Sequence, residues 1–114
     1  MSSPCIFCRI AAKEIPSGIV YEDDDVVAFR DLSPQAPTHV LVISRRHVAS
    51  LDDMAPSDAG LLGAMMLAAK NVAAAAGLAA GYRIVTNCGV NAGQSVSHIH
   101  LHVLGGRPMA WPPG

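Results

Sequence analysis

Three histidines alternate with apolar residues near the end of the sequence, at His98, His100 and His102. Side chains two positions apart on a β-strand point to the same side, so the three imidazoles would share one face while Ile99 and Leu101 face the core. Imidazoles crowded on one face pack poorly and cannot all be charged cheaply, so folding alone does not account for them. The pattern predicts either a metal cluster or a histidine that acts as a nucleophile or acid–base group.

The loop before this strand favours nucleophilic chemistry on phosphorus. Phosphoryl oxygens need several preorganised donors, and a glycine lets the backbone approach them closely. The loop reads Gly93-Gln94-Ser95-Val96-Ser97, which offers backbone N–H groups and hydroxyls to an anion. We therefore expect a phosphate ester or amide to bind beside the histidines, although the loop taken alone is also compatible with an ordinary turn.

Two cysteines near the start of the sequence, Cys5 and Cys8, have the spacing of a thiolate pair that binds zinc. Redox-active pairs share this spacing, so the motif alone leaves both interpretations open. Zinc needs two further ligands, for which the candidates are His47, after the predicted third strand, and His98, the first histidine of the triad. Together they would form a tetrahedral Cys2His2 site that is structural rather than catalytic and leaves His100 free.

The elements that must position these residues follow from apolar periodicity and from the glycines and prolines. We predict an α+β domain in which a mainly antiparallel five-stranded sheet is covered by one long helix, with one short helix before it. The short helix is predicted over residues 6–12, the strands over 19–22, 26–29, 39–44, 82–87 and 97–104, and the long helix from Pro56 to a stop at Gly77 or Gly81. The predicted core side of the long helix consists of Leu62, Met65, Met66, Ala69, Val72, Ala73 and Ala76.

The composition limits the architecture and the partners. The 114 residues suffice for one domain, predicted over residues 1–114, and 51% apolar with 15% charged residues is typical of a folded chain. A formal net charge of −1 provides no positive field for binding nucleic acid. The most apolar stretch, residues 61–80, carries Lys70 and Asn71 in its middle, so we expect no membrane span. An odd number of cysteines, and an N-terminus without the features of a secretory signal, predict a cytoplasmic location.

Several stretches together resemble the histidine triad (HIT) superfamily and, within it, the nucleotide-binding Hint branch. The resemblance covers nearly the whole chain. The Cys-x-x-Cys is similar to that of bacterial-type members, some of which carry structural zinc. The resemblance is carried by His98-Ile99-His100-Leu101-His102-Val103-Leu104, Ser33-Pro34-Gln35-Ala36-Pro37-Thr38-His39, Gly93-Gln94-Ser95-Val96, and Gly105-Gly106-Arg107 with Trp111-Pro112-Pro113-Gly114.

The resemblance implies a HIT-like fold and a role for each site residue. His100 would attack the α-phosphorus and carry a transient nucleotidyl group, which splits a hard displacement into two easier steps. His102 would donate to the phosphoryl oxygens, His39 would be a further active-site histidine, and Ser95 would contact the phosphate or the leaving group. Asp31 would bind the ribose hydroxyls. The substrate-binding residues implied in this way are Phe29, Asp31, Asn87, Gly93, Gln94, Ser95, His100 and His102.

The activity that the resemblance implies is hydrolysis of purine nucleoside 5'-monophosphoramidates or related nucleotidyl adducts, with no metal needed at the reacting phosphorus. A dinucleoside polyphosphate hydrolase is the nearest enzymatic alternative. Two other classes stay open: a nucleotide-binding or interaction module with little turnover, and a metal-centred protein with all three triad histidines as ligands. The resemblance also implies a homodimer, a purine nucleotide (an AMP or GMP moiety) as substrate partner, and a C-terminal segment near the active site.

Overall fold

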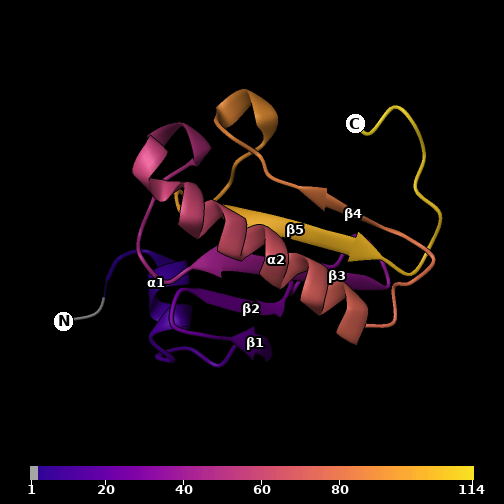
Figure 1. The fold of residues 1–114 in the computed structure, drawn as a ribbon, viewed down its shortest axis with the longest axis horizontal. Helices are drawn as coiled ribbons and strands as arrows, with labels where there is room; N and C mark the ends of the chain where they lie inside the picture. Colours follow the sequence, from indigo (N-terminus) through magenta and orange to yellow (C-terminus); the bar gives the residue numbers. More distant parts are fainter. Residues whose placement is uncertain (1–2) are drawn as a thin grey trace.

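The computed structural model describes residues 3–114, so the first two residues of the predicted domain lie outside the described part. Figure 1 shows one sheet with α2 across one of its faces and α1 at one end. The elements are α1 (Ile6–Ala11), β1 (Ile19–Glu22), β2 (Val26–Arg30), β3 (Thr38–Ser44), α2 (Ala59–Ala75), β4 (Tyr82–Val85) and β5 (His100–Gly105), with short 3-10 turns at Leu51–Asp53, Pro56–Asp58 and Val90–Ala92.

The five strands form one antiparallel sheet in the order β1-β2-β3-β5-β4. The predicted fold class, an α+β domain with a mainly antiparallel five-stranded sheet and one long and one short helix, is therefore confirmed. The last strand of the chain does not lie at the edge, because β5 inserts between β3 and β4. In this register His102 lies opposite Leu41, and His100 lies opposite Ile43.

The two faces of the sheet bury two separate apolar clusters. Apolar side chains that alternate along a strand divide between the two faces, which is why both clusters draw on the same strands. The cluster under α2 contains Val26, Ala28, Val40, Val42, Leu101 and Val103 together with Met65, Ala68, Ala69, Val72 and Ala73 of the helix. The cluster on the other face contains Val27, Phe29, Leu41 and Ile43 with Phe7, Ile10 and Ala11.

The histidine strand is shorter than predicted. β5 begins at His100, and His98 lies at a bend before it, so the predicted strand over 97–104 is wrong at its start. The reason is that the Ile99 N–H donates to the Val48 carbonyl at 2.7 Å, outside the sheet. The predicted strand over 82–87 also ends early, at Val85, because the hydroxyl of the next residue, Thr86, donates to the His100 carbonyl at 2.9 Å.

The long helix also begins later than predicted. Pro56 starts a 3-10 turn, and α2 follows at Ala59 and ends before Gly77, whose φ of +76° suits a glycine after a helix. Met66 is 44% exposed, and Ala76, just after the end of α2, is also exposed, so the assignment of these two residues to the core is wrong, whereas Met65 is fully buried. Successive helix positions differ by about 100°, which places these two methionines on different sides. Within residues 3–114, no helix has both the length and the hydrophobicity that crossing a membrane requires.

The packing of α2 on the sheet predicts the cost of removing one buried leucine. Leu101 is 2% exposed and lies in the cluster under α2, so Leu101→Ala is expected to lower the free energy of unfolding by about 2–5 kcal/mol. Leu32 is 97% exposed, and Leu32→Ala is expected to change the free energy of unfolding by less than about 0.5 kcal/mol. Urea denaturation followed by circular dichroism measures both, and equal losses would contradict this assignment of the core.

Candidate active site and metal centre

His100 lies at the start of β5 and is only 4% exposed. Its Nδ1 lies 2.7 Å from the carbonyl oxygen of His98, which can only accept, so Nδ1 carries the proton and donates. In the neutral ring the other nitrogen, Nε2, then keeps its lone pair. The Phe7 ring from α1 packs against this imidazole edge to face, with ring centroids 5.1 Å apart. This imidazole is thus held in the tautomer that a nucleophile at Nε2 requires.

A second hydrogen-bonded chain sets the proton on His102. The backbone N–H of Gln35 donates to Nδ1 of His39 at 3.0 Å, so the proton of a neutral His39 is on Nε2. That Nε2 lies 2.9 Å from Nδ1 of His102 and donates to it. Nε2 of His102 consequently carries a proton of its own. The chain ends in an N–H donor, which suits the role predicted for His102 toward phosphoryl oxygens.

The environment keeps His102 neutral. Burial, and after it the neighbouring His100 and His39, lower the pKa of His102 to about 4, while Asp31 acts in the opposite direction. The charged form is disfavoured because it would lose water and face like charges. At neutral pH the side chain therefore offers a hydrogen bond rather than a positive charge.

Asp31 follows β2 and lies next to His39, on the side away from His100. One carboxylate oxygen accepts from the Ser33 N–H at 2.7 Å, and the other lies 3.4 Å from Nε2 of His39. Asp31, His39 and His102 have the donor atoms of a possible metal cluster, all within 4.8 Å of one another. The Gln35 N–H argues against that use, because it places the proton of His39 on the nitrogen that would have to bind the ion. The three residues form a hydrogen-bonded group instead.

A cavity of about 360 Å³ opens beside Asp31 and His39, between the ends of β1–β3 and the second half of α2. Its apolar wall includes Val40 and Val72, which belong to the cluster under α2. His100 and His102 are absent from its lining, so this cavity is not the place where a phosphorus atom would meet the triad.

The loop over residues 93–97 is held by the side chain of Gln94. Its amide nitrogen donates to the carbonyls of Ala49 at 2.7 Å and Val96 at 3.0 Å, and its amide oxygen accepts from the Gly89 N–H at 2.9 Å. The Gln94 side chain therefore supports the loop, and contact with a substrate would fall to the backbone. Gly93 adopts φ +86°, a conformation that favours glycine.

The other predicted substrate contacts differ in how accessible they are. Ser95 is exposed, and neither its hydroxyl nor its N–H forms a hydrogen bond with any residue in the range 3–114. Asn87 is half-buried, two residues after β4, and its amide likewise has no hydrogen bond to the described residues. Phe29 is 5% exposed and packs on Phe7 with ring centroids 5.5 Å apart. Phe29 thus supports the Phe7 ring that packs against His100, and little of its own side chain is accessible to a substrate.

The structure brings together the four predicted metal ligands from three separate segments. Cys5 precedes α1, Cys8 lies in its first turn, His47 follows β3, and His98 precedes β5. Their ligand atoms all lie within 4.8 Å of one another. Nδ1 of His98 is 3.3 Å from the sulfur of Cys5 and 3.5 Å from that of Cys8, and Nδ1 of His47 is 3.3 Å from the sulfur of Cys8.

The chemistry of this group fits a zinc ion. Nε2 of His98 donates to the Ser44 carbonyl at 2.7 Å, which leaves the Nδ1 lone pair directed at the two sulfurs. A carbonyl that orients a ligating histidine in this way is a common feature of zinc sites. Burial and the neighbouring Cys5 raise the pKa of the Cys8 thiol, so two thiolates side by side need a cation between them. Two thiolates and two imidazoles are the donor set of closed, tetrahedral sites.

The contacts that three residues make with the histidines were not predicted from the sequence. Phe7 was assigned only to a short helix, yet its ring touches those of both His98 and His100. Gln35 and Ser44 act through backbone groups, on His39 and His98 respectively. Backbone groups leave no trace in residue type. One feature of the sequence pointed to Phe7: it lies between Cys5 and Cys8. If these cysteines and His98 bind the same metal ion, the Phe7 side chain has to lie near His98.

Comparison with known proteins shows the family of this chain. The HIT domain family model matches residues 12–109. An uncharacterized HIT-like protein of Synechocystis is 50% identical over 114 residues, which is the full length of both chains. Among solved structures, a HIT family hydrolase from Legionella pneumophila superposes with a TM-score of 0.94 at 51% identity, covering 96% of this chain and 99% of that one.

A more distant structure, a histidine triad nucleotide-binding protein from Candida albicans, superposes with a TM-score of 0.80 at 32% identity, covering 95% of this chain and 82% of that one. The matches extend across the sheet, α2 and the histidine strand, and the family model includes His39, His100 and His102 within its bounds. The family model covers most of the chain, and the Synechocystis relative matches it over its full length, so the chain belongs to the HIT family.

Proposed function

We propose that this protein hydrolyses purine nucleoside 5'-monophosphoramidates or related nucleotidyl adducts through a nucleotidyl–His100 intermediate. The observation that carries the proposal is the hydrogen bond from Nδ1 of His100 to the His98 carbonyl, which leaves Nε2 as an unprotonated nucleophile. Beside it, His102 is a neutral donor. The Legionella and Candida relatives, a hydrolase and a nucleotide-binding protein by name, support the same chemistry.

The proposed reaction has two displacements at phosphorus. In the first, a bond forms between Nε2 of His100 and the α-phosphorus while the bond to the leaving group breaks, and the leaving amine takes up a proton from solvent. In the second, water attacks the phosphorus and loses a proton to solvent, the Nε2–P bond breaks, and a nucleoside monophosphate is released. The N–H of His102 and the free donors of Ser95 would stabilise the charge that develops on the phosphoryl oxygens. Asp31 would accept hydrogen bonds from the ribose hydroxyls.

Replacement of the proposed nucleophile gives the direct test of function. Incubation with adenosine 5'-monophosphoramidate is expected to yield a nucleotidyl adduct on the wild-type protein, visible by mass spectrometry after rapid acid quench. His100→Ala should form no adduct and should lose activity by about 10³-fold or more, because no other group replaces the attacking lone pair. Ser57→Ala, in the turn before α2, serves as the control and should retain both adduct formation and activity.

The alternatives separate in the same assay. An adduct that persists in His100→Ala would refute the assigned nucleophile. Faster cleavage of a diadenosine polyphosphate than of the phosphoramidate would favour the dinucleoside polyphosphate hydrolase. Tight nucleotide binding without release of product would favour a binding module.

The neutral state of His102 predicts an unusual titration. Its pKa of about 4 lies below the ordinary value of 6.5, so its ¹⁵N side-chain signals should remain those of a neutral ring from pH 8 to pH 5. Between the two pKa values the unfolded chain binds a proton that the folded chain does not. Stability is therefore expected to be full above pH 6.5 and to fall as the pH drops from 6.5 to 4. His102→Gln should show a smaller fall, and a midpoint near 6.5 in the NMR titration would contradict the assignment.

We also propose that Cys5, Cys8, His47 and His98 hold a structural zinc ion. When bound, zinc would supply a fixed positive charge that keeps both thiolates deprotonated and ties α1 to the segments after β3 and before β5. A cytoplasmic location accords with this assignment, because reduced thiols are required and all three cysteines are free in the described chain.

The zinc assignment predicts how metal content responds to substitution. The purified protein should carry about one zinc per chain by elemental analysis. Cys8→Ser should lose it, because a closed site needs all four ligands, whereas Cys88→Ser is the matched control and should keep it. His100→Gln should also keep its zinc. Loss of metal in His100→Gln or His102→Gln would instead favour the metal-centred protein that uses the whole triad.

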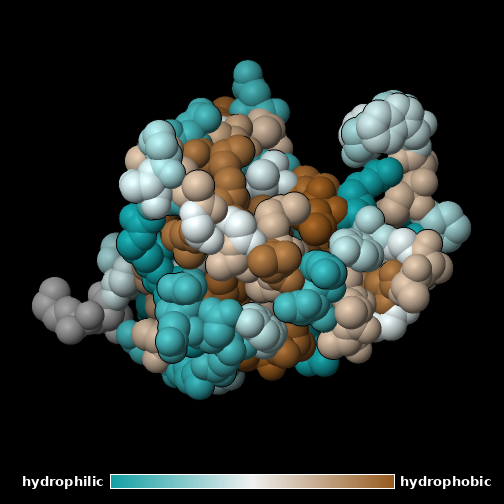
Figure 2. All heavy atoms as spheres, viewed as in Figure 1, coloured by the Kyte–Doolittle hydropathy of each residue, from teal (hydrophilic) through white to brown (hydrophobic). Residues whose placement is uncertain are grey.

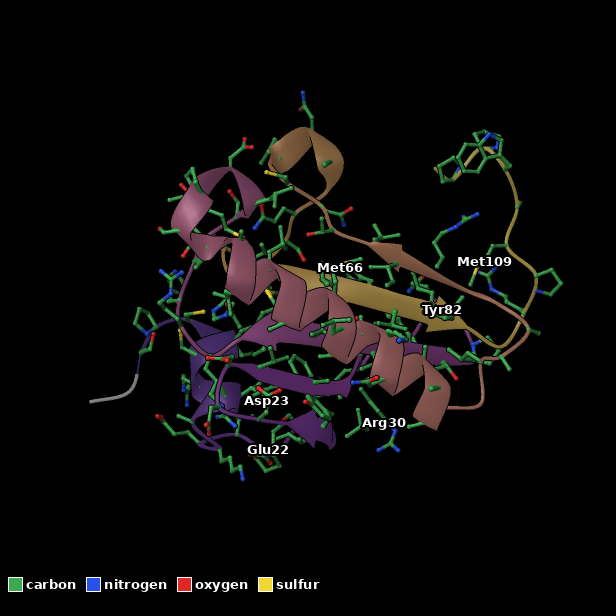
Figure 3. All side chains as sticks on the ribbon, in the orientation of Figure 1. Glu22, Asp23, Arg30, Met66, Tyr82 and Met109 are labelled. Carbon is green, nitrogen blue, oxygen red and sulfur yellow. The ribbon has the colours of Figure 1, made fainter. Side chains whose placement is uncertain are left out.

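A homodimer is proposed from the family and from the exposed apolar surface. Met66 on α2 and Tyr82 on β4, both labelled in Figure 3, are 44% and 41% exposed, and Leu67 is 60% exposed. Figure 2 shows hydrophobic residues at the surface over α2. β4 is also an edge strand, with one side unpaired within the chain. The C-terminal segment projects from the end of β5 with Trp111 83% exposed, so its predicted closeness to an active site would concern the partner's site.

A further inference from the structure

One residue, His98, belongs to both sites. Its ring directs Nδ1 at the sulfurs of Cys5 and Cys8 and donates through Nε2 to Ser44. Its own backbone carbonyl accepts the hydrogen bond from Nδ1 of His100 at 2.7 Å. The residue lies at a bend outside β5, so the ladder of the sheet does not hold its carbonyl. Two other contacts do: the N–H of the same peptide unit, at Ile99, donates to the Val48 carbonyl at 2.7 Å, and the ring is held on the other side of the Cα. The direction of the carbonyl therefore depends in part on where the ring is held.

The short helix α1 makes a second connection. Phe7 stands between Cys5 and Cys8, and its ring packs against those of His98 and His100 with centroids 5.9 Å and 5.1 Å apart. The helix has only six residues, too few to be stable by itself. Its start is held by the cysteines: the Cys5 sulfur accepts from the Cys8 N–H at 3.5 Å, and both sulfurs face His98. The place of the Phe7 ring therefore also depends on this group.

We propose that Phe7 and His98 are positioning residues, through which a metal ion bound by Cys5, Cys8, His47 and His98 sets the tautomer and orientation of His100. The metal takes no part in the reaction and does not touch the nucleotide. This inference rests on the proposed function only for its catalytic consequence, since the state of the His100 ring can be observed without substrate.

The structure also predicts which step depends on the metal. Asp31, His39 and His102 are held by Gln35, Ser33 and one another, and among the described residues they form no hydrogen bond or ion pair with the metal ligands. Removing the metal should therefore leave nucleotide affinity within about threefold. Formation of the nucleotidyl adduct should slow at least about tenfold, because a ring in the wrong tautomer or orientation has no lone pair aimed at phosphorus.

The test compares zinc-loaded and zinc-stripped protein labelled with ¹⁵N in its histidines. With zinc, His100 is expected to show one tautomer with the proton on Nδ1; without zinc, signals of mixed tautomers or exchange are expected. His47→Gln should reproduce the stripped state, since His47 reaches the metal without touching His100. Single-turnover adduct formation and nucleotide affinity, measured on the same samples, supply the second readout.

A matched pair of variants tests the α1 connection. Phe7→Leu is expected to keep its zinc yet lose the single His100 tautomer, because the edge-to-face contact is removed. Ile10→Val alters the same helix and the same apolar cluster without a ring contact to either histidine, and should leave the His100 signals unchanged. Equal effects of the two substitutions on His100 would contradict a specific role for Phe7.

Two outcomes would overturn the inference. One is a zinc-stripped protein that is folded by circular dichroism and retains both the single His100 tautomer and its rate of adduct formation. If stripping unfolds the chain, zinc is replaced by cadmium, which is larger; the His100 shifts should then differ between the two folded forms, and identical shifts overturn the inference. Because the NMR signals are recorded without nucleotide, they test this inference even if the protein lacks the proposed activity.

Discussion

The antiparallel pairing of β3 with β5 is the constraint on which the site depends. It joins segments far apart in the sequence, so that His39 and His102, 63 positions apart, come within 2.9 Å. Inserting β5 between β3 and β4 also removes the histidine strand from the edge of the sheet. The triad is consequently built on the rigid centre of the molecule, with one apolar cluster on each face of the strands that carry it. Such a base holds reacting groups more precisely than loops do.

Backbone groups control the chemistry of the histidines. A main-chain N–H at Gln35 sets the proton on His39, which sets the proton on His102, and a main-chain carbonyl at His98 sets the proton on His100. One histidine is left with a free lone pair and its neighbour with a free N–H. Attack on phosphorus needs both, a nucleophile and a donor to the oxygens. Burial keeps the donor neutral, so the two rings do not repel each other as charges.

The metal group and the triad are parts of one structure. α1 is too short to be stable by itself, and the cysteines at its start face the same histidine whose carbonyl accepts the hydrogen bond from His100. Phe7 fills the space between them and rests on Phe29 of β2. A metal ion bound by this group would stabilise the fold and orient His100 through the same contacts, without approaching the proposed substrate.

The sequence by itself determined the strand pattern, the antiparallel α+β fold, the alternation of histidines and the four candidate metal-ligand positions, because side-chain periodicity and ligand spacing are local properties. Its resemblance to the HIT family also indicated the correct family. Only the tertiary structure decided that β5 starts at His100, that Met66 is exposed, that Gln94 supports its loop, and which nitrogen of each histidine carries the proton. The exposure of Met66 depends on which side of α2 packs on the sheet. The other features depend on backbone partners such as the carbonyls of Val48, Ala49 and Ser44, which any residue type supplies and which only the folded chain brings into reach.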